Sequence, residues 1–282
     1  MNIYKKGNTK LFENDNKVIL KKIQKNYIDL TITSPPYDNM KKYKNTIDTW
    51  TFEDFTAIAD ELFRITKEGG VVVWVVGDAT IEGTETGSSF RQALYFKEIG
   101  FNLYDTMIFL KQAPPPKSPV RQIDCFEYMF VLSKGKPSVF NPRLKKPLKI
   151  PSRTVNYTYM YPVEDSKDHY KMNVRTRKKR RYKLDTNIWQ YKIVKDKFNK
   201  KHPATFPIEL ALDHILTWSE KGYIVLDPFM GSCTVGRACL MTGRKFIGIE
   251  RVPEFFKLSV KNIEQEIKKP KLFNTLEDSL LR

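Results

Sequence analysis

Six short apolar runs that are rich in β-branched residues recur along the chain, and they limit the folds that it can adopt. Their brevity and uniform hydrophobicity are typical of strands buried on both faces of a sheet. Helical patterns separate several of these runs, which predicts an α/β fold with a doubly wound, mostly parallel sheet. The expected strands cover residues 27–33, 71–76, 107–110, 128–132, 223–226 and 246–249.

The expected helices alternate with these strands. Apolar residues from Phe55 to Phe63 recur every three or four positions after Thr51 and Asp54, a pair that fits a helix N-cap, and we expect Gly69 to end this helix. A second helix is expected at about 206–219, a third follows Pro253, and a fourth contains Val235 and stops at Gly243. In open α/β sheets, ligands bind at the carboxyl ends of the strands.

Residues 141–201 interrupt this alternation and carry most of the net charge of +17. They hold 19 Lys and Arg against 5 Asp and Glu, with scattered prolines and interleaved aromatic residues such as Tyr157 and Trp189. We therefore expect a basic insertion that contacts a polyanion, although a solvated charged loop is the ordinary alternative. The best candidates for contacts to the backbone of nucleic acid are Arg175, Arg177, Lys178, Lys179, Arg180, Arg181 and Lys183. The expected organisation is 1–140, the insertion 141–201, 202–270 and a polar tail 271–282.

Composition excludes several other classes of protein. The longest purely apolar run, residues 71–76, is far too short to span a bilayer, and no apolar stretch follows the N-terminal charges. Cys125, Cys233 and Cys239 form no CxxC pair and accompany few histidines, so we expect neither a disulfide framework nor a metal site. These features predict a cytoplasmic protein with no membrane partner.

Two strand ends carry residues suited to chemistry. The first strand ends in the sequence Ser34-Pro35-Pro36-Tyr37, whose prolines must lie past the strand, in a loop of nearly fixed shape. The second ends at Asp227, turns through Pro228 to Ser232, and is followed by a strand that ends at Glu250. A carboxylate at that place fits the ribose hydroxyls of a nucleoside, while an ordinary βαβ unit is the plain alternative. Asp78, at another strand end, either lines the site or is solvated.

Taken together, Ser34 to Tyr37 and Asp227 to Ser232 resemble the catalytic and cofactor motifs of the DNA amino-methyltransferases that use S-adenosylmethionine. Their order, with a basic region between them, resembles that of the β group, and the resemblance covers about residues 7–260. It implies a Rossmann-like fold in which 1–140 form the catalytic half, 141–201 the target-recognition insertion and 202–270 the cofactor-binding half. It also implies double-stranded DNA as partner. A cognate restriction endonuclease and a second copy of the chain stay open as further partners, and the host is expected to be a prokaryote or a phage.

The rigid loop suits methylation of an exocyclic amine, whose lone pair is delocalised into the base. The Ser34 side chain and the Pro35 carbonyl would accept both amine protons and aim the lone pair at the methyl group, while Tyr37 stacks on a flipped base. The resemblance further implies a set of cofactor contacts. They are Asn8, Ser34, Thr205, Phe206 and Pro207 from the His202–Pro207 motif, Asp227, Pro228, Phe229, Gly231, Ser232 and Glu250.

Two positions depart from the family pattern. Asn8, which follows Gly7, stands where Gly-Asp is usual near the adenine of the cofactor, and Cys233 stands where Gly is common. If residue 233 needs a positive φ, its cysteine carries strain.

Ser34 favours cytosine N4 as the methylated atom, because family members with Asp or Asn there usually methylate adenine N6. Adenine N6 stays the alternative, whereas cytosine C5 chemistry lacks a cysteine after proline. A non-catalytic nucleic-acid-binding protein with this fold, and RNA as the substrate, also stay open.

Overall fold

The computed structural model describes residues 2–36, 50–112, 121–147, 154–162, 170–178, 182–192 and 206–269 of the chain. They form two compact units. Unit 1 comprises 1–141 together with 187–282, and unit 2 comprises 142–186. Within the described residues, no helix is both long enough and apolar enough to cross a membrane.

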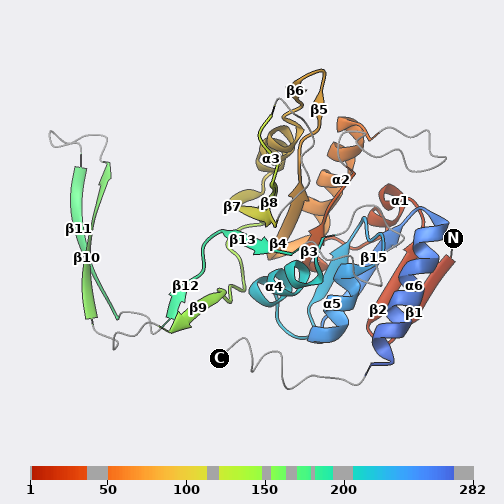
Figure 1. The fold of residues 1–282 in the computed structure, drawn as a ribbon. Helices are drawn as coiled ribbons and strands as arrows, with labels where there is room; N and C mark the ends of the chain where they lie inside the picture. The colour runs from red at the N-terminus through yellow and green to blue at the C-terminus, as the bar shows by residue number, and fades with distance from the viewer. Residues whose placement is uncertain are drawn as a thin grey trace. The chain divides into compact units, whose positions relative to one another are not determined.

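Unit 1 is built on one nine-stranded sheet, which confirms the predicted α/β class (Figure 1). Its strand order is β1-β2-β15-β14-β3-β4-β8-β7-β13. Five neighbouring pairs are parallel, and the antiparallel pairs are β1 with β2, β4 with β8, and β8 with β7. The strands are β1 Asn2–Lys6, β2 Thr9–Glu13, β3 Ile28–Thr33, β4 Thr66–Val76, β7 Asn102–Lys111, β8 Phe126–Ser133, β13 Ile188–Tyr191, β14 Ile224–Asp227 and β15 Lys245–Glu250.

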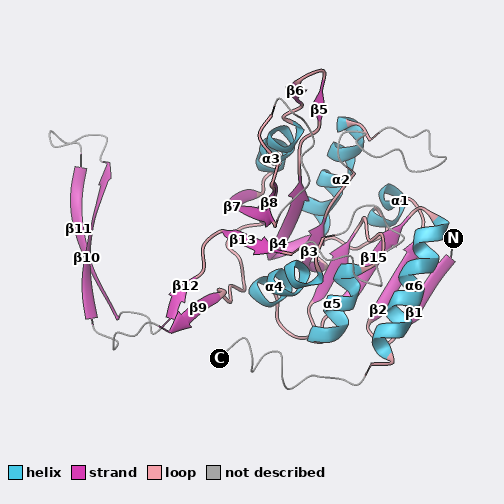
Figure 2. Ribbon diagram, viewed as in Figure 1, coloured by secondary structure: helices cyan, strands magenta, loops and turns pink. Residues whose placement is uncertain are grey.

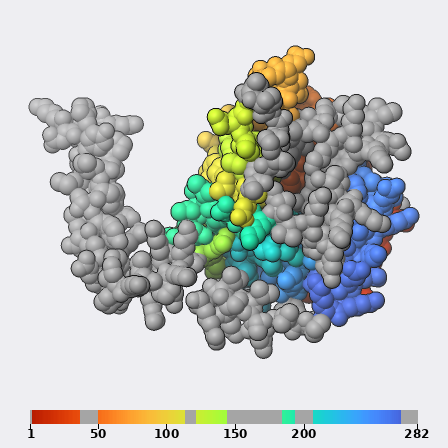
Figure 3. Space-filling model, in the orientation of Figure 1, coloured from red at the N-terminus to blue at the C-terminus, as the bar shows by residue number. Residues whose placement is uncertain are grey.

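Helices cover both faces of this sheet, as Figure 2 shows by colour. On one face lie α1 (Asn16–Leu20), α2 (Phe52–Ile65) and α3 (Ser88–Glu98), packed on side chains such as Trp74. On the other lie α4 (Ile208–Trp218), α5 (Thr234–Thr242) and α6 (Pro253–Ile267), packed on Val73 and its neighbours. Atoms of these last three helices, cyan to blue, are visible on the face drawn in Figure 3. A small hairpin, β5 (Thr80–Ile81) with β6 (Thr84–Glu85), follows β4.

Helix α2 begins as predicted but ends early. Thr51 and Asp54 form a capping box, in which each side chain accepts a hydrogen bond from the other residue's backbone N–H. The expected stop at Gly69 is wrong, because α2 ends at Ile65 and β4 begins at once at Thr66. The pairing of β4 with β3 then shifts register between Ile28 and Leu30. Gly69 has a φ of +77°, so it lies in this irregular stretch of the strand rather than at a helix end.

Unit 2 contains four strands that the sequence analysis did not predict. Strands β10 (Thr154–Pro162) and β11 (Tyr170–Lys178) form an antiparallel two-stranded ribbon, and β9 (Leu144–Pro147) pairs with β12 (Tyr182–Leu184). Aromatic and β-branched residues do alternate through Thr154–Tyr161, which is typical of a strand. This uncharged stretch was grouped with the basic residues around it, so the strand was not predicted.

The predicted end of the insertion at residue 201 is wrong. Strand β13 pairs with β7 of unit 1, from Ile188 opposite Ile108 to Tyr191 opposite Lys111. Trp189, expected among the aromatic residues of the DNA-contacting segment, is instead 4% exposed in the core, 4.7 Å from the ring of His214. The separate unit therefore ends near Thr186.

Candidate active site

The two motif-bearing strands are neighbours in the sheet and end at the same edge. Strand β14 pairs in parallel with β3, with Val225 opposite Leu30 and Leu226 opposite Thr31. The Thr33 hydroxyl, in the last residue of β3, donates a 2.7 Å hydrogen bond to Asp227 Oδ1, in the last residue of β14. Ser34 and the 228–232 loop therefore leave the sheet from the same edge.

The proline loop is described as far as residue 36. Pro35 is buried, and Ser34 and Pro36 are partly buried, so the loop begins inside the molecule and not on an exposed turn. Tyr37, the expected base-stacking residue, lies outside the described residues, as do His202 to Thr205 of the predicted cofactor motif. Phe206, two residues before α4, packs against the hydrophobic core, and Pro207 is the N-cap residue of that helix.

Asp227 holds the loop that follows it. Its Oδ1 accepts hydrogen bonds from the Thr33 hydroxyl and from the Phe229 backbone N–H, the latter at 3.0 Å. Burial raises the pKa of Asp227 to about 7, and the nearby charge of Glu250 adds to the rise, while the two hydrogen bonds oppose it. The carboxyl is 3% exposed, so its contacts fix the turn between β14 and α5 from within.

Two neighbouring elements, β15 and α6, also hold the 228–233 loop. The Met230 N–H donates to the Ile249 carbonyl of β15 at 3.0 Å. From α6, the Ser259 hydroxyl lies 2.5 Å from the Gly231 carbonyl, and the Asn262 amide donates to the Ser232 carbonyl at 2.9 Å. The backbone of the loop is therefore positioned before any ligand binds.

Cys233 adopts the left-handed conformation, with a φ of +68°, at the N-cap of α5. The condition under which the sequence analysis expected strain is met. Its side chain is fully buried against Gly236, where an added Cβ would collide with the Cys233 sulfur and with the ring of Phe246. The packing of the buried Cys233 side chain thus opposes the energetic cost of its strained backbone.

Glu250 joins the end of β15 to the same loop. One carboxylate oxygen accepts the Gly231 N–H at 3.0 Å, and the other accepts the Val252 N–H at 2.8 Å. Burial is the main reason that the pKa of Glu250 is raised. Each carboxylate oxygen can accept about two hydrogen bonds, so Glu250 retains acceptor capacity for the hydroxyls of a ribose. This capacity fits the predicted nucleoside cofactor.

The structure contradicts the assignment of Asn8 to the cofactor site. Asn8 is exposed in the turn before β2, and its carbonyl accepts the Phe246 N–H at 2.8 Å. Because β2 and β15 are parallel, with Thr9 opposite Phe246 and Glu13 opposite Glu250, Asn8 lies at the amino edge of the sheet. The site lies at the opposite edge.

The turn after β2, which was not predicted, does reach the edge of the sheet at which Glu250 lies. Asn14 follows β2, and its N–H donates to the Glu250 carbonyl at 3.1 Å. Asp15 is the N-cap of α1, and the Asn16 amide donates to the Pro228 carbonyl at 3.2 Å. The signal was present in the sequence as Asn14-Asp15-Asn16, a polar run that is typical of a turn that caps a helix.

Two other predicted residues are engaged in packing or capping. Phe229 packs with Trp50 at a ring distance of 5.4 Å and with Trp74 at 6.3 Å, on the α2 side of the sheet. Asp78 accepts the Ser89 N–H at 2.8 Å and the Ser89 hydroxyl at 2.5 Å, which caps α3. Asp78 was expected either to line the site or to be solvated. Its contacts with Ser89 support neither expectation.

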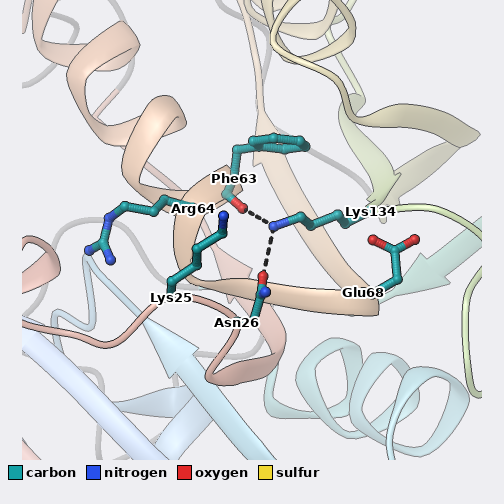
Figure 4. Close-up of a pocket in the computed structure, with 6 residues that line it drawn as sticks. All are labelled: Lys25, Asn26, Phe63, Arg64, Glu68 and Lys134. Carbon is teal, nitrogen blue, oxygen red and sulfur yellow. Dashed lines mark hydrogen bonds between the residues drawn. The ribbon is translucent and has the colours of Figure 1, made fainter.

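A pocket of about 360 Å³ lies away from this edge, near the end of α2 (Figure 4). Lys134 crosses it and donates to the carbonyls of Phe63, at 2.8 Å, and Thr66, at 3.0 Å, and to Asn26 Oδ1, at 2.9 Å. An ammonium group has three donors, and these three acceptors use all of them. The pocket is therefore part of the end of a helix, and it supplies no group to the active site.

Of the predicted DNA-contacting residues, Arg175, Arg177 and Lys178 lie in β11 and Lys183 lies in β12. Lys179, Arg180 and Arg181 fall outside the described residues. All of these positions belong to unit 2.

Comparison with known proteins identifies the family to which the chain is similar. A family model described as DNA methylase, of the N6/N4 methyltransferase type, matches residues 28–261. The chain is 44% identical over 247 residues to the orphan methyltransferase M.BamHII of Bacillus amyloliquefaciens, which covers 85% of this chain and 90% of that protein.

Solved structures show the same fold. The PvuII DNA methyltransferase, described as cytosine-N4-specific, aligns with a TM-score of 0.69 at 20% identity and covers 99% of this chain and 92% of its own. The complex of M1.HpyAVI with S-adenosylmethionine aligns with a TM-score of 0.59 at 24% identity, covering 90% and 98%.

Proposed function

Since the chain belongs to the N6/N4 DNA methylase family, we propose that it transfers the methyl group of S-adenosylmethionine to the exocyclic N4 amine of cytosine in duplex DNA. The observation that carries this proposal is the hydrogen bond between Thr33 and Asp227. It joins the strand that delivers the Ser34–Tyr37 loop to the strand that delivers the 227–232 loop. The residues suited to hold an amine and those suited to hold a cofactor therefore leave one edge of one sheet.

On the cofactor side, Glu250 would bind the ribose hydroxyls, and the backbone of Pro228 to Ser232 would line the cavity next to it. S-adenosylmethionine, the methyl donor of DNA methylases, supplies an electrophilic methyl group on a sulfonium. The Gly231 N–H is held by Glu250, and its carbonyl by Ser259, so this part of the wall is rigid. Asn14 and Asn16 hold the turn after β2 against the same wall.

On the amine side, Ser34 and Pro35 would accept the two protons of the exocyclic amine. Two acceptors in fixed positions favour the geometry in which the nitrogen lone pair points away from the ring plane, and rigidity reduces the entropic cost of reaching that geometry. Pro35 is buried, which holds its carbonyl in place. Tyr37 would stack on the extruded base, a contact that contributes about 1–3 kcal/mol per base.

The choice of cytosine N4 rests on Ser34 and on the description of the PvuII enzyme, whose fold this chain shares over nearly its whole length. Adenine N6 is the second candidate, since the family model covers both amines. We also propose that the activity belongs to the bacterial cytoplasm. A nuclease partner is not required by this assignment, as M.BamHII is described as an orphan enzyme.

The test is to express the protein in a host that lacks DNA methylation and to identify the modified base and its context by direct sequencing. We expect N4-methylcytosine at one short sequence, and its loss in Ser34→Ala and Tyr37→Ala. N6-methyladenine instead would establish the second candidate. Tight DNA binding without any modification would indicate a binding protein, and methylation confined to RNA would overturn DNA as the substrate.

The cofactor side has a matched pair of variants at the two edges of the sheet. Glu250→Gln removes a charged acceptor, and we expect the dissociation constant of S-adenosylmethionine to rise about 10-fold or more, as the loss of a hydrogen bond to a charged group predicts. Asn8→Ala leaves the main-chain bond to Phe246 intact, and we expect no change. Equilibrium dialysis of both variants checks this. Equal weakening by both would contradict the placement of the cofactor at the Glu250 edge.

A further inference from the structure

The ribbon formed by β10 and β11 has two faces of different composition. Its register places directly opposite each other the pairs Val155 with Arg177, Tyr157 with Arg175, Tyr159 with Asn173, and Tyr161 with Lys171. Directly opposite residues of an antiparallel pair share a face, and alternate residues along a strand do too. We call this set the tyrosine-arginine face. It comprises Val155, Tyr157, Tyr159, Tyr161, Lys171, Asn173, Arg175 and Arg177.

The remaining positions form the opposite face, here called the threonine-methionine face. It comprises Thr154, Asn156, Thr158, Met160, Pro162, Tyr170, Met172, Val174, Thr176 and Lys178. The tyrosine-arginine face carries three basic residues and the opposite face carries one, and neither carries an acidic residue. Charge and aromatic residues are thus concentrated on one side of the ribbon.

We propose that the tyrosine-arginine face enters the major groove of the target DNA and reads its sequence. This inference rests on the proposed function and deepens it, because it assigns the residues that select the methylated site. The major groove of B-form DNA, about 12 Å wide, admits a two-stranded ribbon. The major groove of A-form RNA is too deep and narrow for it, so the occupant is duplex DNA. A ribbon of two strands is marginally stable by itself, so it gains order when a groove encloses it.

The spacing along β11 matches the spacing of base pairs. Residues rise about 3.3 Å each along a strand, and base pairs rise about 3.4 Å each, so alternate residues are about two base pairs apart. From Lys171 to Arg177 the face therefore spans about six base-pair steps. A recognition sequence of that order would be covered by one strand.

The central positions have the side chains that read bases. Asn makes a bidentate pair with adenine and Arg with guanine in the major groove. Because the groove curves around the duplex, a nearly straight ribbon lies deepest at its centre and diverges from the bases at its ends. Asn173 and Arg175 therefore contact base edges, whereas Lys171 and Arg177 contact phosphates, which position the ribbon without reading sequence.

The test compares neighbouring residues of β11 that lie on opposite faces. Once the methylated site is known, the full-length protein is assayed for methyl transfer on the cognate duplex and on duplexes that each differ from it by one base pair. We expect Asn173→Ala and Arg175→Ala each to lose discrimination at one or two positions, by about 5-fold to 150-fold. Arg175→Lys should lose it as well, because lysine keeps the charge but lacks the planar fork. Val174→Ala and Thr176→Ala, on the other face, should keep the wild-type profile.

The terminal residues supply a second comparison. Arg177→Ala should weaken DNA binding equally for all sequences and reduce the slope of affinity against salt concentration by about one, whereas Thr176→Ala, the uncharged neighbour on the opposite face, should leave both unchanged. Unchanged affinity for S-adenosylmethionine shows that unit 1 of a variant is folded, and the wild-type profile of Val174→Ala and Thr176→Ala shows that substitution in β11 leaves the ribbon intact. Discrimination that survives Asn173→Ala and Arg175→Ala, or that fails in Val174→Ala and Thr176→Ala, would overturn the proposal. A wild-type protein that methylates no DNA would instead overturn the proposed function.

Discussion

Asp227 is the residue at which structure and chemistry are most closely linked. It is a buried carboxyl with two donors, and both donors belong to the elements that form the site. Its elevated pKa, about 7 against an ordinary value of 3.8, means that the interior disfavours its charge more strongly than the two hydrogen bonds favour it. Such a group serves better as an internal anchor than as a ligand.

A pH dependence of stability follows from Asp227. Between about pH 4 and pH 7 the folded protein holds a proton that the unfolded chain releases, so the free energy of unfolding falls as the pH rises through this window. Asp227→Asn removes the titration but keeps an oxygen that accepts from Thr33 and Phe229. We expect wild type to lose up to about 4 kcal/mol relative to this variant between pH 4 and pH 8, measured by urea unfolding. Parallel profiles for the two proteins would contradict the assignment.

Cys233 makes a second prediction at the scale of one residue. Cys233→Ala keeps a Cβ in the left-handed conformation and loses the buried sulfur, while Cys233→Gly loses the sulfur and the strain together. The strain exceeds the extra entropy of glycine in the unfolded chain, so we expect the glycine variant to be the more stable of the two by about 1 kcal/mol. Thermal unfolding of both variants measures this difference. An alanine variant that is more stable than the glycine variant by about 0.5–1 kcal/mol would show that residue 233 carries no strain.

Among the elements, α2 shows how an end can be fixed from outside the helix. Lys134, which follows β8, donates to the carbonyls of Phe63 and Thr66, at the point where α2 passes into β4 (Figure 4). It also lies 4.6 Å from the centre of the Phe63 ring. A cation at the C-terminus of a helix is favoured by the helix dipole.

We therefore expect Lys134→Met to lower the free energy of unfolding by about 2 kcal/mol, because the carbonyls at the end of α2 lose a charged donor. Lys136→Met is the matched control, since Lys136 is exposed two residues away and should tolerate the change. Urea unfolding gives the stabilities. Methyl transfer per folded molecule should be unchanged in both, because the pocket lies away from the Glu250 edge. Equal stability of the two variants would show that Lys134 does not hold the helix end.

The elements that could be predicted from sequence are those with an internal periodic signal. Strands β3, β14 and β15 contain short stretches rich in apolar residues, and α2 combines an apolar stripe with a capping box, so their existence and order are confirmed. The end of α2 was missed because the chain passes from helix to strand without a loop. Gly69 lies within strand β4 and does not end the helix. The ribbon of unit 2 was missed because its segment was assigned by net charge alone, although the residues of β11 alternate with a period of two. Local sequence patterns do not reveal which residues of neighbouring strands lie opposite each other. Asn8 was therefore assigned to the wrong edge of the sheet.

At the scale of the whole molecule, the net charge and the hydrophobic core are concentrated in different units. Unit 2 holds 14 Lys and Arg against 4 Asp and Glu, so it carries +10 of the net +17 in 45 residues. Both hydrophobic clusters among the described side chains lie in unit 1, as does the candidate active site. Unit 1 therefore has the core that folding requires, and we propose that unit 2 supplies the charge for DNA binding.

Replacing residues 142–186 by a flexible Gly/Ser linker tests this division. Both junctions are held by unit 1, where the Asn141 N–H donates to the Thr217 carbonyl and the Ile108 N–H donates to the Asn187 carbonyl, each at 2.8 Å. We expect the variant to fold and to bind S-adenosylmethionine, seen as a rise in melting temperature with added cofactor. Its DNA methylation should be lost. The affinity of the full-length protein for DNA should fall steeply with salt, by about 0.9 log units of affinity per log unit of salt for each phosphate contacted, and that dependence should vanish in the variant. Methylation of DNA by the shortened protein at the wild-type rate would place target binding in unit 1 and contradict the division.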